Sequence, residues 1–370
     1  MSESIRARMM VAACVTALAL AACGGGGGGS ASTVEPVPVG TTPPVNPAPT
    51  TPTTPTTPTT PTTPTTPTTP TTPTAPTNPD PLTPPAPVSP DTPTLPGAAG
   101  APVATGNIAA DGREWINYRR GLIGLSTLVR SNLIDIAAQG HSDYQRINNT
   151  ITHDQTPGKE GFTGVDTSAR LAAAGYRFNT SASRAYGEVI SATSNGSGQY
   201  MAEELITAIY HRFVIFEPVF KEIGTGAATT SAGYNYFTAN FTANNGYGAG
   251  LGGGQVAVWP FNGQVSVPRN FFSNTESPDP VPDRNEVGYP ISVHANIDLI
   301  VAVTSFTVRP RGGAELAVRL LTNANDTHTG RSSAAIVPLA PLLANTVYDV
   351  SFTGTAGGTA VTRTWSFTTR

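Results

Sequence analysis

The stretch YHRFVIFEPVFKEIGTG, residues 210–226, contains the change of pattern that decides the fold class. Its first part continues an apolar helical repeat that begins near residue 200. Pro218 ends that helix, because proline lacks a backbone donor and clashes with the preceding turn. A short apolar run of the kind found in strands then covers 223–229. The sequence therefore predicts a helix over 200–216 that is followed closely by a strand.

Further helices and strands are predicted on both sides of this stretch. The spacing of apolar residues, with capping residues and glycine or proline at the ends, predicts the helices, and short apolar or alternating runs predict the strands. Helices that precede a set of strands with short turns indicate an α+β layered domain. The additional predicted helices cover 111–121, 126–147 and 166–175, and the additional predicted strands cover 185–192 and 234–242.

Beyond residue 259 the pattern changes again. Residues 259–289 are rich in proline and are predicted to form a connector. The remaining 290–370 carry short runs of valine, threonine and aromatic residues without a helical period. Such runs, separated by glycine, asparagine and proline turns, are typical of a small all-β sandwich. The predicted strands are 291–295, 299–308, 315–321, 346–352 and 361–368.

Residues 24–105 have a composition that does not support a folded core. Six glycines follow Cys23, and 24 of the 35 prolines lie between Pro36 and Pro102. Pro-Thr-Thr repeats place a proline at every third position, which matches the three-residue turn of a polyproline II helix. Such a helix needs no core, so the sequence predicts a disordered Thr/Pro-rich stalk that acts as a spacer.

The first 23 residues have the pattern of a secretion signal. Arg6 and Arg8 precede an apolar run over 9–22. The run ends in Leu-Ala-Ala-Cys, which resembles the lipobox of bacterial lipoproteins. That resemblance implies cleavage before Cys23, acylation of its thiol and anchoring in a lipid bilayer. Lipoproteins retained in the inner membrane typically carry aspartate after the cysteine, whereas this chain has glycine. In a Gram-negative host the resemblance therefore favours the outer membrane, with the periplasmic face and the cell surface as alternatives.

Composition excludes several other classes of protein. The chain has 12% charged residues, and its folded C-terminal part is nearly neutral. A nucleic-acid-binding role is not expected, because such proteins neutralise phosphates with an excess of basic residues. After the N-terminus, the sequence has no apolar run long enough for a membrane span. The only cysteines are Cys14 and Cys23, so the exported part would have no disulfide.

Six motifs follow one another along the chain. They are WINYRRGLIGL, LIDIAAQGHSDY, ITHDQTPGKEGFTG, RLAAAGY, YGEVIS and YHRFVIFEPVFKEIGTG. In this order they resemble the CAP superfamily, also called SCP or PR-1-like proteins. The resemblance covers about residues 106–248, within a predicted domain of 106–258. It implies an α-β-α sandwich with a groove between its layers, lined by two histidines and two acids.

The resemblance places three of the four groove residues. His153 matches the first histidine, Glu188 the acid of the Gly-Glu-Asn motif, and His211 the second histidine. Val189 replaces the asparagine of that motif. For the second acid we expect Glu204, seven residues before His211 and on roughly the same face of the predicted helix. Two acids further along the chain are weaker candidates, Glu217 and Glu222.

These residues suggest several alternative activities. His153 and His211 could bind a divalent metal such as zinc, and Glu188 could act as a general base towards a metal-bound water. The favoured interpretation is that the groove binds a small apolar ligand, a peptide or an envelope component. The alternatives are a metal-dependent hydrolase of the cell envelope and a purely structural or adhesive surface protein. Catalysis is the less favoured outcome.

The remaining features of the sequence are not expected to contribute a site. His141 lies on an apolar helical face and is expected to pack in the core. His294 and His328 are expected to be solvated. Residues 290–370, with the stretches PLAPLLANTVYDVSFTGTAGG and TWSFTT, resemble bacterial Ig-like modules, which usually act as spacers or binding platforms.

Overall fold

The structure is a computed structural model that describes residues 11–14 and 100–370. The predicted stalk, Cys23 and most of the predicted signal lie outside the described residues. For 11–14 only the backbone is described. Within the described part of the chain, no helix has the length and apolar character needed to cross a membrane.

The α-helices all lie in the first part of the described chain, and side chains cap several of them. Asn107, Asp166 and Ser197 each accept a hydrogen bond from a backbone N–H of the first turn, which satisfies a donor that has no partner within the helix. The helices are α1 (Ile108–Leu122), α2 (Asn132–Asn148), α3 (Thr167–Ala173), α4 (Gly198–Thr207) and α5 (Ile209–Ile215).

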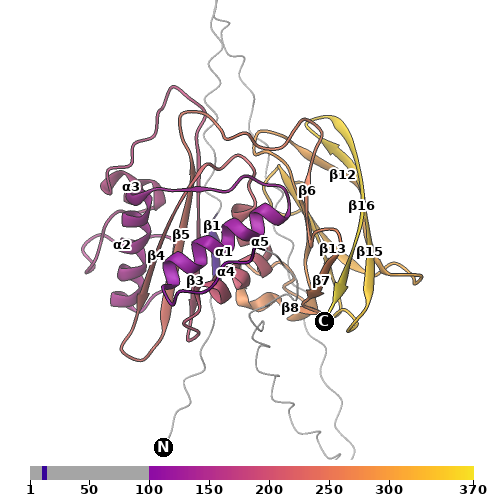
Figure 1. Cartoon of the computed structure of the whole chain (residues 1–370), viewed down its shortest axis with the longest axis horizontal. Coiled ribbons are helices and arrows are strands. Elements are labelled where there is room, and N and C mark those ends of the chain that lie inside the picture. The colour runs from indigo at the N-terminus through magenta and orange to yellow at the C-terminus, as the bar shows by residue number, and fades with distance from the viewer. Residues whose placement is uncertain (1–10, 15–99) are drawn as a thin grey trace, which may run out of the picture. The chain divides into compact units, whose positions relative to one another are not determined.

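A mixed sheet forms the middle layer of this part, with the strand order β2-β4-β5-β3-β1-β9 (Figure 1). β3 pairs antiparallel with β5 along its whole length, from Ala185 opposite Ala243 to Thr193 opposite Asn235. The strands are β1 (Val11–Cys14), β2 (Val129–Arg130), β3 (Ala185–Thr193), β4 (Glu222–Thr229), β5 (Asn235–Ala243) and β9 (Glu276–Ser277).

Two glycines in β4 allow α2 to lie directly on the sheet. A Cβ atom at Gly224 would lie 2.3 Å from the backbone nitrogen of Asp135, and one at Gly226 would lie 2.2 Å from that of Gln139. Thr225 points to the opposite face, because side chains alternate along a strand, and its hydroxyl donates to the Ala109 carbonyl of α1. Helices therefore cover both faces of the sheet, and the predicted mixed α and β class is confirmed.

The single helix predicted over 200–216 is wrong, because Ala208 adopts an extended conformation and separates α4 from α5. Charged side chains satisfy the backbone groups at the break. The Arg212 guanidinium donates to the carbonyls of Ile206 and Thr207 at the end of α4. The carboxylate of Glu276 accepts hydrogen bonds from the first N–H groups of α5.

The C-terminal part is rich in strands, as predicted. One four-stranded sheet has the order β13-β14-β11-β6 and the other β12-β15-β16-β7. β6 and β7 come from the boundary of the predicted connector and from the connector itself, and they extend both sheets. The strands are β6 (Ala257–Trp259), β7 (Gln264–Val267), β8 (Asn270–Phe272), β10 (Glu286–Gly288), β11 (Ile291–His294), β12 (Val301–Pro310), β13 (Val318–Thr322), β14 (Ser333–Pro338), β15 (Val347–Ala356) and β16 (Thr359–Thr369).

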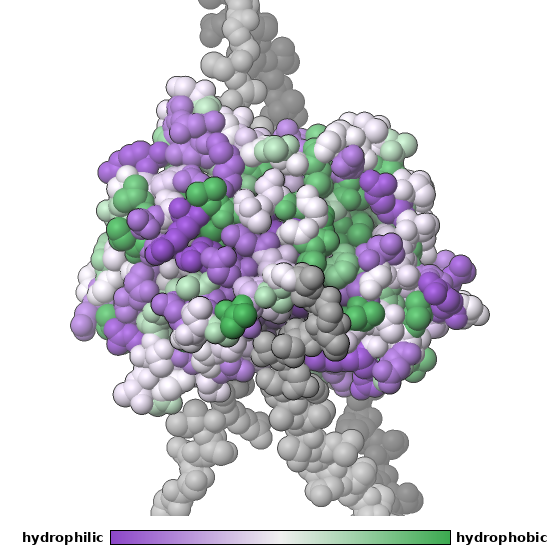
Figure 2. Space-filling model, in the orientation of Figure 1, coloured by the Kyte–Doolittle hydropathy of each residue, from purple (hydrophilic) through white to green (hydrophobic). Residues whose placement is uncertain are grey.

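The helix-bearing part and the strand-rich part share one hydrophobic core. The ring of Phe216 lies 5.1 Å from the ring of Trp259, and both are fully buried. Arg212 also donates to the Pro290 carbonyl across this core. His294 is buried against Phe216 and is not solvated as expected. On the face drawn in Figure 2, hydrophilic and hydrophobic residues are both spread over the described surface.

Candidate functional site

A buried cluster surrounds Glu188 in the middle of β3. His153, in the loop after α2, donates through Nδ1 to Glu188 Oε1 over 2.9 Å. Arg170 of α3 donates through Nη2 to both carboxylate oxygens, each at 2.7 Å. Its Nη1 donates to the His153 carbonyl, so one guanidinium fixes the loop and the carboxylate together. All three residues are buried.

Glu188 is held in its charged form. Burial alone would raise its pKa, but His141, the Arg170 guanidinium and the hydrogen bond from His153 outweigh burial and lower the pKa to about 2. His141 is itself neutral near pH 7, so Arg170 supplies the opposing charge under those conditions. An ionised carboxylate is only an acceptor, so His153 must carry a proton on Nδ1.

His141 is a packed helix residue, fully buried, in agreement with its predicted role. Its Nε2 lies 2.7 Å from the Thr152 carbonyl, and its Nδ1 lies 2.9 Å from the Gln155 amide nitrogen. The orientation of the Gln155 side-chain amide is fixed because its Oε1 accepts a hydrogen bond from the Thr163 backbone N–H, which turns its NH2 group towards His141 Nδ1. Burial is the main cause that lowers the pKa of His141 to about 4. His141 therefore supports the cluster in its neutral form.

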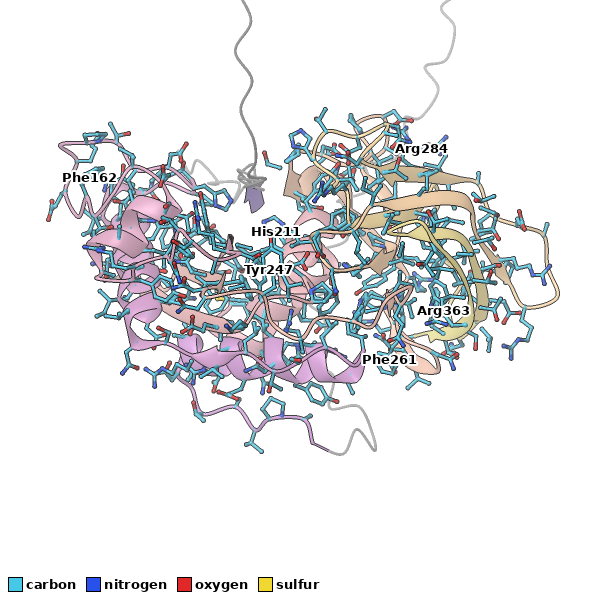
Figure 3. All side chains as sticks on the ribbon, turned by 90° about the horizontal axis from the view of Figure 1, so that it is seen from above. Phe162, His211, Tyr247, Phe261, Arg284 and Arg363 are labelled. Atoms are coloured by element: carbon cyan, nitrogen blue, oxygen red, sulfur yellow. The ribbon has the colours of Figure 1, made fainter. Side chains whose placement is uncertain are left out.

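The second histidine has an acid partner that sequence reasoning missed. His211 of α5 donates through Nδ1 to Oε1 of Glu276, over 3.0 Å, and both side chains are fully buried. The same carboxylate accepts from the backbone N–H groups of Ile209, at 2.8 Å, and Tyr210, at 2.7 Å. Glu276 thus caps α5 and orients the imidazole. Figure 3 shows His211 among densely packed side chains.

The acids expected near His211 contact other residues. Glu204 accepts a hydrogen bond from Tyr200, and burial raises its pKa to about 7. Glu217 accepts from the Val219 and Ile297 backbone N–H groups. Glu222 accepts from the Tyr176 hydroxyl. Among the described residues, the acid hydrogen-bonded to the His211 ring is Glu276, from the segment predicted as a connector.

The two histidine–glutamate pairs lie on opposite sides of one strand. β1 pairs with β3, where Cys14 is opposite Glu188, and also with β9, where Val11 is opposite Glu276. Strands lie about 4.8 Å apart and rise about 3.3 Å per residue. The Cα atoms of the two glutamates are therefore separated by about 14 Å, diagonally across the position of β1.

The residues present do not fit a zinc site with three protein ligands. Both glutamates are engaged, Glu188 by Arg170 and His153, and Glu276 by backbone N–H groups and His211. That leaves one imidazole on each side. In the described part of the chain, no three histidine, cysteine, aspartate or glutamate side chains group in a way that could hold a metal ion. The arrangement instead fixes two imidazoles, each hydrogen-bonded to a buried glutamate.

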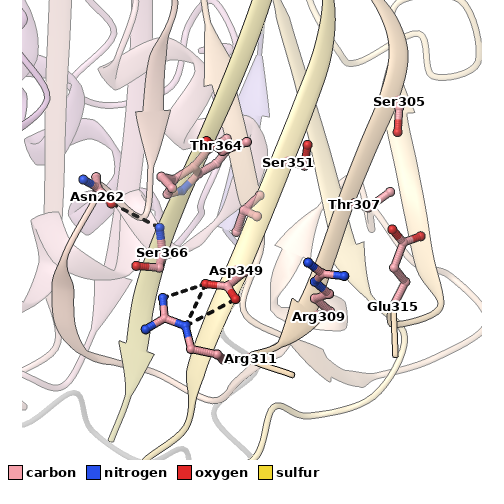
Figure 4. Close-up of a pocket in the computed structure, with 12 residues that line it drawn as sticks. Asn262, Ser305, Thr307, Arg309, Arg311, Glu315, Asp349, Ser351, Thr364 and Ser366 are labelled. Carbon is pink, nitrogen blue, oxygen red and sulfur yellow. Dashed lines mark hydrogen bonds and ion pairs between the residues drawn. The ribbon is translucent and has the colours of Figure 1, made fainter. Parts of the chain in front are cut away.

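A hollow of about 570 Å³ lies over β12, β15 and β16 (Figure 4). Two pairs of its lining residues contact each other. Arg311 forms an ion pair with Asp349 at 2.7 Å, and Asn262 accepts from the backbone N–H of Ser366. Arg311 is well exposed to solvent. The hollow lies on the solvent-facing side of this sheet.

Comparison with known proteins identifies the family of the helix-bearing part. Residues 114–241 match the model of the CAP family, described as the cysteine-rich secretory protein family. No curated protein matches the chain. An extracellular SCP-domain protein from Bacillus anthracis str. Ames is similar at 22% identity and a TM-score of 0.30, over 36% of this chain and 39% of that one. The chain thus spans about two fifths of that protein's length.

A second solved structure, an outer surface protein of Borrelia burgdorferi, is similar at 16% identity and a TM-score of 0.30. The match covers 36% of this chain and 89% of that one. The family match includes His153, Glu188 and His211, whereas Glu276 lies beyond it. Residues 114–241 are therefore a CAP domain of the cysteine-rich secretory protein family, and the acid partner of its second histidine comes from the following segment.

Proposed function

We propose that this chain is an exported binding protein whose CAP domain holds an apolar ligand, a peptide or an envelope component between its two histidine–glutamate pairs. One observation carries the proposal. Each imidazole is fixed through Nδ1 by a buried carboxylate that is itself held by other donors. Each ring therefore has a set orientation, with a proton on the Nδ1 that faces its glutamate.

The same geometry favours binding over hydrolysis. A general base works best with a pKa near the working pH, whereas the pKa of Glu188 is lowered to about 2. The ion pair with Arg170 further opposes proton uptake by this carboxylate. The described residues also lack a three-ligand metal group that could activate water. These features support a site that holds a ligand without chemical change.

Export and anchoring complete the proposal. The apolar run before Cys23 acts as a cleaved signal, acylated Cys23 inserts in the outer membrane, and the Thr/Pro-rich stalk holds the CAP domain away from the lipid. A Cys23→Ser variant of the full chain tests the anchor. We expect a labelled fatty acid supplied to the host to be incorporated into the wild type and not into the variant, and equal labelling of the two would contradict anchoring.

The ligand is tested by extraction of the full chain purified from its host, followed by mass spectrometry of the released molecules. We expect a bound ligand in the wild type and its loss in a His153→Gln, His211→Gln double variant. Glu204→Gln is the matched control, since Glu204 is a half-buried acid of α4 that is hydrogen-bonded to Tyr200. Equal ligand content in the double variant, or an empty wild type, would contradict the proposal.

A further inference from the structure

The six-stranded sheet contains a slot that is one strand wide. β3 and β9 are not neighbours in the sheet, and β1 lies between them, antiparallel to β3 and parallel to β9. With neighbouring strands about 4.8 Å apart, the two edges are about 10 Å apart. This distance accommodates one extended chain and is too narrow for two. Among the described strands, β9 has no pairing other than that with β1.

Contacts outside the slot hold both of its edges in place. β3 is paired with β5 over nine residues on its other side, and Arg170 anchors Glu188 within it. On the second edge, Glu276 is fixed by the N-terminal N–H groups of α5 and by His211. Because none of these contacts involves β1, the edges are ordered before a strand enters. Preorganisation of this kind lowers the entropic cost of binding.

The strand found in the slot belongs to the segment predicted to be removed on export. Val11–Cys14 lies within the apolar run of the predicted signal, upstream of Cys23. Cleavage would therefore leave the backbone groups of β3 and β9 without this strand. Exposed strand edges of this kind are templates for pairing with another chain, and unpaired buried backbone groups are costly.

We propose that the exported protein binds one extended segment of another polypeptide in this slot, by β-strand addition between β3 and β9. The inference rests on the proposed function, because it requires export and cleavage. Main-chain hydrogen bonds to two edges would supply the affinity. The sequence of β1, Val-Ala-Ala-Cys, indicates a partner segment of small, uncharged residues. The segment runs antiparallel to β3, with the two histidine–glutamate pairs at diagonally opposite margins.

Binding is tested with the full chain purified after export, once its N-terminus has been determined by mass spectrometry. The probe is a labelled synthetic peptide of residues 8–17 carrying Cys14→Ser, and fluorescence anisotropy measures binding. We expect saturable binding, and at least tenfold weaker binding of the same peptide with Ala13→Pro. Proline removes an N–H and is not tolerated within a strand paired on both sides.

Disulfide trapping tests the register. Residue 12 lies opposite Ser277 in the parallel pair, so a peptide with Ala12→Cys and Cys14→Ser should be trapped by the Ser277→Cys protein. Thr362→Cys, on an exposed position of β16, is the control and should not be trapped. Both protein variants keep Cys23, because the predicted cleavage depends on it, and its acylated thiol cannot form a disulfide.

The outcomes separate this inference from the proposed function. Absent binding, equal affinity of the proline peptide, or equal trapping at both thiols would overturn strand addition, while ligand extraction could still succeed. An exported chain that retains residues 1–22 would also overturn it, because the slot would be filled by the chain itself. A chain that is not exported would instead refute the proposed function.

Discussion

Replacing Arg170 by methionine should destabilise the protein in a manner that depends on pH. The substitution keeps much of the buried volume but removes the donors to both oxygens of Glu188 and to the His153 carbonyl. The lowering of the Glu188 pKa from 4.5 to about 2 corresponds to about 3 kcal/mol, at 1.36 kcal/mol per pKa unit. Leaving a buried charge without its partner costs a similar amount, about 3–5 kcal/mol.

The sign of the pH dependence follows from the lowered pKa. A carboxyl whose pKa is depressed in the folded state contributes stability above its unfolded pKa, and this contribution is lost as the pH falls towards about 2. Wild type and Arg170→Met should therefore differ by about 3 kcal/mol at pH 7, and the difference should shrink below about pH 4.5. Urea unfolding at pH 7, 5 and 3.5 measures this difference.

A double-mutant cycle with Glu188→Gln isolates the ion pair from other effects of the substitution. The cycle should give a coupling of about 3 kcal/mol between Arg170 and Glu188 at pH 7, because the two charges interact directly. A difference between wild type and Arg170→Met that stays constant from pH 7 to pH 3.5, or a coupling near zero, would refute the reasoning. Either result would mean that Glu188 is not held ionised by Arg170.

Three further predictions concern the same framework. Glu276→Gln should lower the free energy of unfolding by about 2 kcal/mol, because α5 and His211 lose a charged acceptor. Urea unfolding measures this loss, and the control Glu204→Gln should lower the free energy of unfolding by less. Gly226→Ala should lower the free energy of unfolding by about 3 kcal/mol, because the added Cβ would overlap α2. Gly253→Ala should have a much smaller effect, because no atom lies within 4 Å of its added Cβ, and thermal unfolding compares the two variants. As the pH falls from 6.5 to 4, His141 should lower the free energy of unfolding by about 3 kcal/mol, because only the unfolded state takes up its proton in that range. Urea unfolding over this pH range should show a smaller decrease in the free energy of unfolding for His141→Gln than for the wild type.

The local sequence pattern was sufficient to predict most helices and strands of the CAP domain. Side-chain periodicity and capping residues act over a few positions, so the predicted α2, α3, β3, β4 and β5 agree with the structure to within a few residues, apart from the start of α2. β14 was missed because all six of its residues are buried, and a strand buried on both faces lacks the alternating pattern that indicates a strand.

Long-range contacts explain what could not be predicted. The break at Ala208 depends on Glu276, which lies 68 positions later. The first backbone N–H groups of α5 have no acceptor within the helix, and the Glu276 carboxylate accepts their hydrogen bonds. The resemblance supplied His153, Glu188 and His211 but no motif for the second acid, and helical spacing then favoured Glu204. One feature of the sequence could have indicated the second acid, because Glu276 is the only charged residue between Arg269 and Asp279.

Arg170 was part of a quoted motif but received no role, because a lone arginine on a short helix is usually solvated. Its complete burial could be recognised only once α3 was placed beside β3. His294 shows the reverse case. It was expected to be solvated because of its place in a polar strand-rich region, yet the shared core encloses it.

The central claim is that two imidazoles are each fixed through Nδ1 by a buried glutamate. Long-range nitrogen–proton NMR of the imidazole rings in the full chain tests it most directly, with the five histidines assigned by single substitutions. The account predicts the Nδ1–H tautomer for His153 and His211 and the Nε2–H tautomer for His141 at pH 7. The Nε2–H tautomer at either His153 or His211 would contradict it.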